Sequence, residues 1–332
     1  MEYMNEEIKY IIQKLLKKNN IHPILLDIGA SGDIPEIWTS IKEDSYYIGF
    51  DPDLRDLHTS NEDGFFKSVI FNSAVIEDIN SVEVPFYLTK APYCSSTLSP
   101  DNESLSNYIF YDLFTVEKIQ SMKSSNLNHL MESQNITHID WFKTDSQGID
   151  LSLFKSLENE IRSKILAVDI EPGLIDAYVG EDLFADAHTY LIQNGFWLSE
   201  LNVRGTGRIK KSTLDRLSSI NTQNSSEILK KVIKNSPVWC EARYLRTIEW
   251  MDSNHFSHEN YILSIIFALM DNQLGHAFDI LFQYEKKNGD DEFSKEMLVT
   301  LENYLNDKII QQKSIIQKNF IYKCIDYLKK RI

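Results

Sequence analysis

Three acidic residues follow two of the predicted strands of this chain. Asp145 closes the run "IDWFKTD", and Asp169 and Glu171 lie at the end of the run "KILAVDIEPG". Because neighbouring strands of an open α/β sheet present their carboxyl ends to one cleft, we expect the three carboxylates to lie together. Such a cluster can bind a divalent cation such as Mg²⁺ through oxygen ligands, or raise the pKa of one member until it serves as a general base. Each acid, taken singly, could equally cap a helix or form an ion pair.

A second candidate site follows the first apolar run. The stretch "ILLDIGASGDIPEIW" (24–38) predicts a strand buried on both faces, a tight turn at Gly29 and Gly32, and a helix start at Asp33 and Pro35. A turn of this kind aims backbone N–H groups and the positive end of a helix at an anion. A strand–turn–helix junction without a ligand is the plain alternative.

Two carboxylates near that turn indicate which ligand it would take. In "YYIGFDPD", Asp51 ends the second strand, about twenty residues after the glycines, where a carboxylate can accept hydrogen bonds from both hydroxyls of a ribose. Dinucleotides and S-adenosylmethionine share that feature. Asp27, two residues before Gly29, favours S-adenosylmethionine, because its charge suits an amino group and a sulfonium better than a pyrophosphate. The full GxGxxG of NAD sites is also missing.

The elements that must position these residues alternate along the chain. We expect a mostly parallel sheet with crossover helices, which "GFWLSEL" and "PVWCEARYL" close as an antiparallel pair. Three- and four-residue apolar spacing predicts an amphipathic N-terminal helix and three or four helices after about residue 255. The apolar runs that predict the parallel strands are 24–28, 46–50, 68–71, 136–142 and 164–170. The predicted domains are an N-terminal helix over 1–21, an α/β domain over 22–250 and a helical domain over 251–332.

Composition excludes several classes of protein. With a formal net charge of −15, the chain is not expected to bind nucleic acid, since phosphate-backbone binding relies on a basic surface. No apolar run is long enough to span a bilayer, and the first residues lack the core of a signal peptide, so we expect a cytoplasmic protein. The three cysteines are widely spaced with no CxxC, which argues against disulfides and structural zinc.

Two further segments carry groups that could recognise an acceptor substrate. In "APYCSSTLSPD", the hydroxyls of Tyr93, Ser95 and Ser96 could orient a polar acceptor, with a solvent-facing serine turn as the plainer alternative. Residues 204–234 are locally basic, and Arg208 is a candidate for the phosphate of a nucleotide- or lipid-linked sugar. A solvated surface is the simpler explanation for that segment.

Six blocks of the sequence, in order, resemble those of the FkbM-type S-adenosylmethionine-dependent methyltransferases. The resemblance runs from about residue 22 to 247, and it is specific because all six occur in the family's order. The blocks are "LLDIGASGDIPEIW", "YIGFDPD", "YCSSTLSPD", "IDWFKTDSQGIDLSLFKSL", "EPGLIDAYVGEDLFADAHTYLIQNGFWLSEL" and "SPVWCEARYLRT".

The resemblance implies a class I methyltransferase fold, Rossmann-like, with a seven-stranded sheet and a reversed hairpin at one edge. It implies transfer of a methyl group from S-adenosylmethionine to an oxygen of a sugar or glycan-type acceptor. Asp51 would bind the ribose of the cofactor. Its methionine end would contact Asp27, Gly29, Ala30 and Gly32, and its adenine Asn72, Ser73 and Ala74.

One departure from the family pattern changes the expected base. The family often has Glu before the glycine of the fourth block, whereas this chain has Gln147. We therefore expect Asp145, with Glu171, to orient and deprotonate the acceptor, and Gln147 to contact it. Two other functions stay open: a cofactor-binding module whose helical tail recruits a partner, and an NAD-dependent oxidoreductase. Residues 255–332 lie outside the resemblance and could cover the cleft, form a homo-oligomer or dock a partner.

Overall fold

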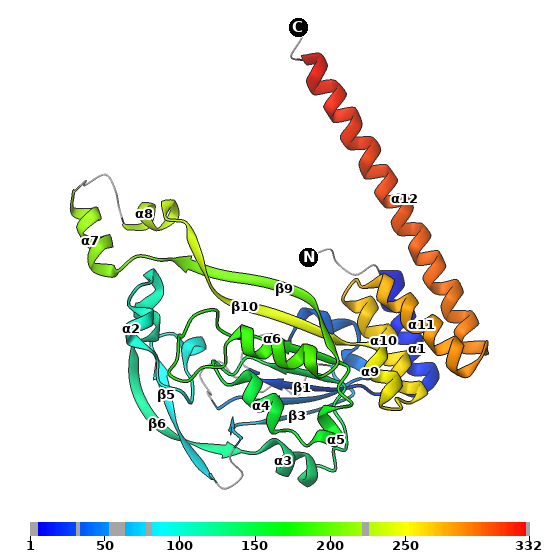
Figure 1. Ribbon diagram of the computed structural model, residues 1–332, viewed down its shortest axis with the longest axis horizontal. Helices are drawn as coiled ribbons and strands as arrows, with labels where there is room; N and C mark the ends of the chain where they lie inside the picture. Colours follow the sequence, from blue (N-terminus) through cyan, green and yellow to red (C-terminus); the bar gives the residue numbers. More distant parts are fainter. Residues whose placement is uncertain (1–5, 31–33, 53–63, 78–80, 221–225, 330–332) are drawn as a thin grey trace. The chain divides into compact units, whose positions relative to one another are not determined.

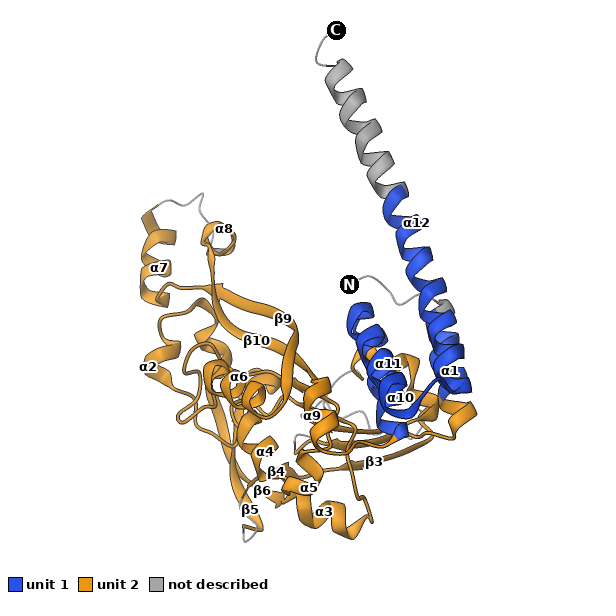
Figure 2. Ribbon diagram, turned by 45° about the vertical axis from the view of Figure 1, so that its right-hand side comes forward, with its two compact units in different colours: residues 1–15, 258–332 blue, residues 16–257 orange. Residues whose placement is uncertain are grey.

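A computed structural model of the chain describes residues 6–30, 34–52, 64–77, 81–220 and 226–329 (Figure 1). The chain divides into two compact units, residues 16–257 and residues 1–15 with 258–332 (Figure 2). The boundary near residue 257 lies close to the predicted one. The grouping of the first fifteen residues with the C-terminal helices was not predicted, since the amphipathic N-terminal helix was expected to pack on the segment that follows it.

The unit of residues 16–257 is built on a seven-stranded sheet in which β10 alone is antiparallel to its neighbours. This arrangement confirms an α/β fold with a mostly parallel sheet, including the predicted antiparallel pair. In spatial order the strands are β3 (Lys67–Phe71), β2 (Tyr46–Phe50), β1 (Ile24–Ile28), β7 (Trp141–Thr144), β8 (Ala167–Ile170), β10 (Asn235–Arg246) and β9 (Phe196–Gly207).

The central strands are continuous apolar runs in the sequence because they are buried on both faces of the sheet. All five residues of β1 are buried, and the side chains of Leu26, Phe142 and Val168 join one core with those of the surrounding helices. These helices include α3 (Leu127–Ser133), α4 (Asp150–Ser156), α5 (Asn159–Arg162) and α6 (Phe184–Gln193). The apolar spacing of Leu151, Phe154, Leu157 and Ile161 predicts one helix after Gly148. The segment instead forms two short helices, because the chain is extended at Leu157 (φ −62°, ψ 142°).

The crossover from β1 to β2 also differs from its prediction. Its described part contains two 3₁₀ helices, η1 (Glu36–Ser40) and η2 (Lys42–Asp44), where an α-helix was expected. Trp38 and Ile41 are fully buried and anchor these tight turns, which are too short to carry an α-helical dipole. Asp33, the predicted helix start, lies outside the described residues.

A second, three-stranded sheet has the order β4 (Ala74–Val75), β6 (Val116–Ser125), β5 (Glu83–Thr89). The run "VPFYL" predicts a strand at the position of β5. No pattern predicts β6, whose segment "VEKIQSMKSS" is mostly exposed and has little apolar alternation. Around this sheet lie η3 (Pro92–Cys94), α2 (Asn102–Leu105) and η4 (Ile109–Phe114).

Strands β9 and β10 continue past the main sheet as a two-stranded ribbon. β8 pairs with β10 at Ala242–Leu245, whereas β9 pairs along β10 as far as Asn235. The far end of the ribbon carries α7 (Lys211–Ile220) and α8 (Ser226–Val232) (Figure 1). After β10, α9 (Ile248–Ser253) ends this unit of the chain.

The other unit is helical, as predicted for the tail. It contains α10 (His258–Met270), α11 (Leu274–Asn288), α12 (Glu292–Lys329) and the beginning of α1 (Glu6–Asn19). A salt bridge of 2.8 Å joins Lys14 of α1 to Glu296 of α12. Among the helices of the described residues, none combines the length and the apolar composition needed to cross a bilayer.

Candidate functional site

The carboxyl ends of β1, β2 and β7 are bonded to one another around Gly29. The amide of Asp145 donates to the carbonyl of Ile28 at 2.8 Å, and the amides of Gly29 and Ala30 both donate to the carbonyl of Phe50 at 2.9 and 3.0 Å. Gly29 has φ +81°, and a Cβ there would lie 2.3 Å from the carbonyl oxygen of Asp145, so the close approach requires glycine. The sequence predicted that backbone amides of this turn would bind an anion. That prediction is wrong for the amides of Gly29 and Ala30, because both donate to a carbonyl of the protein itself.

Asp27 lies beneath this turn and is engaged by two side chains. Its carboxylate accepts hydrogen bonds from Lys143 Nζ at 2.7 Å and from the hydroxyl of Tyr47 at 3.0 Å. Burial alone would lower the pKa of Lys143, but the charges of Asp27 and Asp145 outweigh it and raise that pKa above its ordinary value. The structure thus places Asp27 in a buried ion pair, where the sequence predicted direct contact with a ligand.

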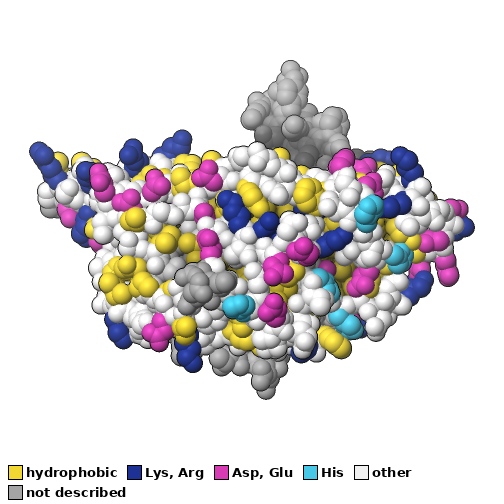
Figure 3. Space-filling model, turned by 60° about the horizontal axis from the view of Figure 1, so that its bottom comes forward, with side chains coloured by type: hydrophobic (Ala, Val, Ile, Leu, Met, Phe, Trp, Pro, Cys, Tyr) yellow, Lys and Arg dark blue, Asp and Glu magenta, His cyan; other side chains and the backbone are white. Residues whose placement is uncertain are grey.

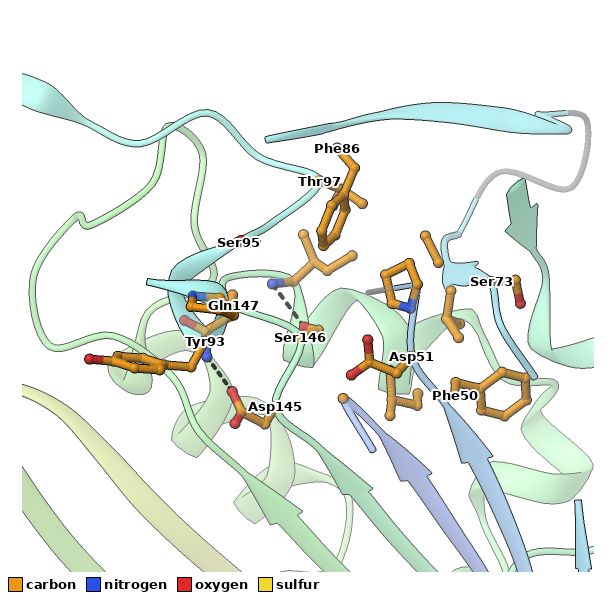
Figure 4. A pocket seen from close by; sticks show the side chains of 17 residues that line it. Phe50, Asp51, Ser73, Phe86, Tyr93, Ser95, Thr97, Asp145, Ser146 and Gln147 are labelled. Carbon is orange, nitrogen blue, oxygen red and sulfur yellow. Dashed lines mark hydrogen bonds between the residues drawn. The ribbon is translucent and has the colours of Figure 1, made fainter. Parts of the chain in front are cut away.

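A pocket, here called pocket A, opens above the ends of β1, β2 and β7 (Figure 4). Its described walls enclose about 90 Å³. The carboxylate of Asp51 points into it from the end of β2 (Figure 4), and the strand end is fixed by the amide of Asp51, which donates to the carbonyl of Phe71 at 3.1 Å. The polar residues that line pocket A are Asp51, Ser73, Ser95, Thr97, Asp145, Ser146 and Gln147.

The residues predicted to bind a cofactor divide into three sets. Gly29, Asp51, Ser73 and Ala74 line pocket A. Asp27, Ala30 and Asn72 are not among its lining residues, and the Asn72 amide instead donates to the backbone carbonyls of Asp51 at 2.9 Å and of Pro52 at 3.2 Å. Gly32 lies outside the described residues.

A second pocket, pocket B, adjoins the first and encloses about 320 Å³. Acidic side chains line it from the ends of β7 and β8 and from the following loop: Asp145, Glu171 and Glu181. The β9–β10 ribbon adds Gly205, Thr206 and Trp239. Tyr93, Asp145 and Gln147 line both pockets. A ligand in pocket A and a second molecule in pocket B would therefore meet at these three residues.

Gln147 holds Asp145 at this junction. Its amide nitrogen donates to Asp145 Oδ1, and its amide oxygen accepts from the hydroxyl of Tyr178 at 2.9 Å. The hydroxyl of Ser96 donates to the Gln147 backbone carbonyl at 2.7 Å. Gln147 has φ +57°, a conformation that costs energy for a residue other than glycine. The surrounding bonds hold it there, so Gln147 acts on Asp145 as well as lining both pockets.

The acids of pocket B hold their protons more tightly than free carboxylic acids. Burial, followed by the negative charges of Asp145 and Asp150, raises the pKa of Glu171 to about 9. Burial also raises the pKa of Asp145, against the opposing effects of Lys143 and of hydrogen bonds from Gln147 and Glu171. Burial and the proximity of the two negative charges therefore disfavour the state in which both carboxylates are ionised.

Replacing Glu171 with Gln is expected to stabilise the fold at alkaline pH. Because the folded-state pKa of Glu171 is raised to about 9, its contribution is fully present below the unfolded pKa and is lost as pH rises toward 9. Glu171→Gln should increase the free energy of unfolding by about 1–3 kcal/mol at pH 8.5 and change it little at pH 5. Urea titrations at both pH values measure this difference. Glu132→Gln, at an exposed position of α3, is the control; an equal gain at both pH values would contradict the assignment.

The predicted cluster of three acids does not form. The Asp169 carboxylate accepts from Arg243 Nε at 2.8 Å and from Trp141 Nε1 at 3.2 Å, and Asp169 lines neither pocket. Across the described residues, no group of three or more His, Cys, Asp or Glu side chains is arranged to hold a metal ion. The set of Asp145, Asp169 and Glu171 therefore does not fit a divalent cation such as Mg²⁺.

The residues predicted to bind the acceptor do not all lie in one pocket. Tyr93 is 66% exposed and borders both pockets. Ser95 and Ser96 are buried and bond locally: Ser95 Oγ accepts from the amide of Thr89 at 3.1 Å, and Ser96 Oγ accepts from that of Leu98 at 3.0 Å. Arg208 is exposed and outside both pockets, so the structure does not support its predicted role at the acceptor.

Several residues of the site were not predicted from the sequence. Lys143 was visible as a single charge inside the apolar strand "WFKT", and a buried charge requires a partner. Tyr178 and Glu181 come from the loop after β8, which has no periodicity to reveal them. Phe110 and Phe114, which line pocket B, come from the aromatic run "YIFYDLF", and that run could have indicated them.

Comparison of the chain with protein-family profiles, with curated proteins and with solved structures finds no match. What the site can do chemically therefore follows from its own residues.

Proposed function

We propose that this protein is an S-adenosylmethionine-dependent methyltransferase that acts on a hydroxyl oxygen of a small sugar or glycan-type acceptor. The observation that carries the proposal is the meeting of pockets A and B at Asp145, Gln147 and Tyr93. A methyl donor in pocket A and an acceptor in pocket B would face each other there, with a carboxylate between them.

Pocket A fits the proposed donor in three respects. Asp51 at the end of β2 presents a carboxylate for the ribose hydroxyls. Gly29 lets the turn after β1 pack against the carbonyl of Asp145, and the two amides that would otherwise attract a phosphate are bonded to Phe50. Ser73 and Ala74 lie where the family resemblance expects adenine. When bound, the donor supplies an electrophilic methyl on its sulfonium.

In the proposed mechanism, Asp145 accepts the proton of the acceptor hydroxyl. The bound donor would supply its methyl group to that oxygen and would leave as S-adenosylhomocysteine. Its raised pKa brings its basicity closer to neutral pH, which is where a general base works best. Glu171 keeps its own proton and donates a hydrogen bond to Asp145, and Lys143 favours the anion. Gln147, held by Tyr178, fixes the direction of the Asp145 carboxylate. In-line alignment of oxygen and methyl supplies the remaining rate enhancement.

Pocket B suits an acceptor with several hydroxyl groups. Its carboxyl groups can accept or donate hydrogen bonds, while Phe110, Phe114 and Trp239 offer flat apolar surfaces against which the C–H face of a sugar can lie. The strand order with one reversed strand next to the edge, and the six ordered sequence blocks, support the class I and FkbM-type assignment.

Calorimetry followed by an activity assay tests the proposal. S-adenosylhomocysteine and S-adenosylmethionine should bind the full chain in the micromolar range, and NAD should not. Incubation with methyl-labelled S-adenosylmethionine and a panel of sugar nucleotides and glycan extracts should transfer label to an acceptor. Binding of NAD in place of both S-adenosyl compounds would favour an oxidoreductase and overturn the proposal.

A cofactor-binding module that recruits a partner is the second candidate function. It is favoured by exposed apolar side chains on α12, including Leu305 and Ile310. The two functions differ in turnover: a binding module would take up S-adenosylmethionine without forming S-adenosylhomocysteine in the presence of any acceptor.

A further inference from the structure

The end of the β9–β10 ribbon is basic in an otherwise acidic protein. Residues 204–220 and 226–234, here called the tip, contain eight lysines and arginines and two acidic residues, whereas the whole chain has 34 and 49. Figure 3 shows dark-blue basic side chains at its left-hand end, where Figure 1 places α7 and α8. Such a segregation of charge points to an anionic partner at this end of the ribbon.

Much of that charge is not neutralised within the protein. Three of the eight side chains form ion pairs with acidic residues: Arg204 with Glu241 at 3.0 Å, Lys211 with Asp112 at 3.1 Å and Lys230 with Glu227 at 3.2 Å. Four others are exposed and form no ion pair with any residue that the structure describes: Lys210, Arg216, Lys231 and Lys234. The tip therefore presents several cations to an external partner.

Exposed apolar side chains accompany these cations. Leu217 and Ile220, three residues apart in α7, are 40% and 72% exposed. Ile228 and Val232, four apart in α8, are 51% and 76% exposed. These spacings place each pair on one face of its helix. Both helices thus carry an apolar stripe beside lysines or arginines, which a purely solvated surface does not require.

We propose that the tip binds the surface of a membrane that contains anionic phospholipids. Lysines and arginines are attracted to the headgroups, and short apolar stripes enter the boundary between headgroups and acyl chains. A nucleic acid would account for the charge but offers no comparable place for Ile220 and Val232. This binding is independent of methyl transfer. Because Gly205 and Thr206 of the same ribbon line pocket B, it would bring that pocket close to a lipid surface.

Co-sedimentation of the full chain with vesicles tests the proposal. The protein should bind vesicles of equimolar phosphatidylglycerol and phosphatidylcholine, and binding should weaken as salt is raised. Pure phosphatidylcholine vesicles should bind it at least tenfold less. Two double variants, Lys231→Glu with Lys234→Glu and Ile220→Ser with Val232→Ser, should each lower the partition coefficient about tenfold or more.

Matched variants elsewhere control for net charge and for apolar surface. Lys118→Glu with Lys286→Glu makes the same change of charge on β6 and α11. Val82→Ser with Val299→Ser removes two exposed apolar side chains that lie outside the tip. Both control variants should bind vesicles like the parent chain. Circular dichroism shows whether each variant is folded. Equal loss in test and control variants would overturn the proposal. So would tight binding of single-stranded RNA that the charge variant abolishes and the serine variant leaves unchanged.

Discussion

Replacing Asp145 with Asn is expected to lower kcat by about 10²- to 10⁴-fold, the usual contribution of a general base. The amide keeps the shape of the side chain but cannot accept the proton of the acceptor hydroxyl. Cofactor affinity should change little, because the proposed donor is bound mainly by the other walls of pocket A. Single-turnover methyl transfer and calorimetry with S-adenosylhomocysteine measure the two quantities separately.

Asp169→Asn is the matched control for this prediction. Asp169 lies on the neighbouring strand, but its carboxylate bonds Arg243 and lies outside both pockets. Its replacement should reduce stability and leave turnover of the folded enzyme near that of the parent. Full activity in Asp145→Asn would place the base elsewhere in pocket B, with Glu181 the next candidate because burial raises its pKa to about 7.

Asp51→Asn is expected to weaken binding of S-adenosylmethionine by about 10- to 100-fold. A hydrogen bond to a charged group is worth about 1.5–3 kcal/mol, and the carboxylate can accept from both ribose hydroxyls, whereas the amide oxygen replaces it only in part. Once the enzyme is saturated with donor, kcat should be close to that of the parent chain. Calorimetry gives the dissociation constant directly.

Asp140→Asn controls for loss of a buried carboxylate from the same sheet. Asp140 precedes β7, and its Oδ2 accepts from the amide of Ile24 at 2.8 Å, so it lies at the opposite end of β1 from pocket A. This variant should be less stable but should bind S-adenosylmethionine with unchanged affinity. If Asp51→Asn bound the donor as tightly as the parent chain, the ribose contact would be excluded.

The central strands could be predicted because burial on both faces leaves a continuous apolar run in the sequence. β6 could not, since its exposed residues carry no such signal. The break at Leu157 also escaped prediction, because Leu151, Phe154 and Leu157 all reach the core on either side of it. Side-chain periodicity reports which residues are buried and says less about how the backbone connects them.

The residues that reach the pockets could be predicted because they follow strands. The ion pairs that hold other acidic residues away from the pockets were not predicted. Asp51, Asp145 and Glu171 follow strands and reach the pockets as expected. Asp27 and Lys143 are register partners on β1 and β7, a pairing that opposite charges in two buried strands could have suggested. Asp169 and Arg243 are likewise register partners, on β8 and β10, and this pairing of opposite charges distinguishes Asp169 from Glu171.

The position of β10 has a consequence for the order of folding. β10 is the last strand of the sheet in the sequence, yet it lies between β8 and β9. Until Arg246 has left the ribosome, β8 is an open edge and β9 has no neighbour with which to pair. A nascent chain that stalls before Asn235 therefore exposes an apolar sheet edge, the kind of surface on which chains aggregate. Closure of this sheet must wait for the end of its own domain, so the edge of β8 stays exposed for most of the synthesis of that domain.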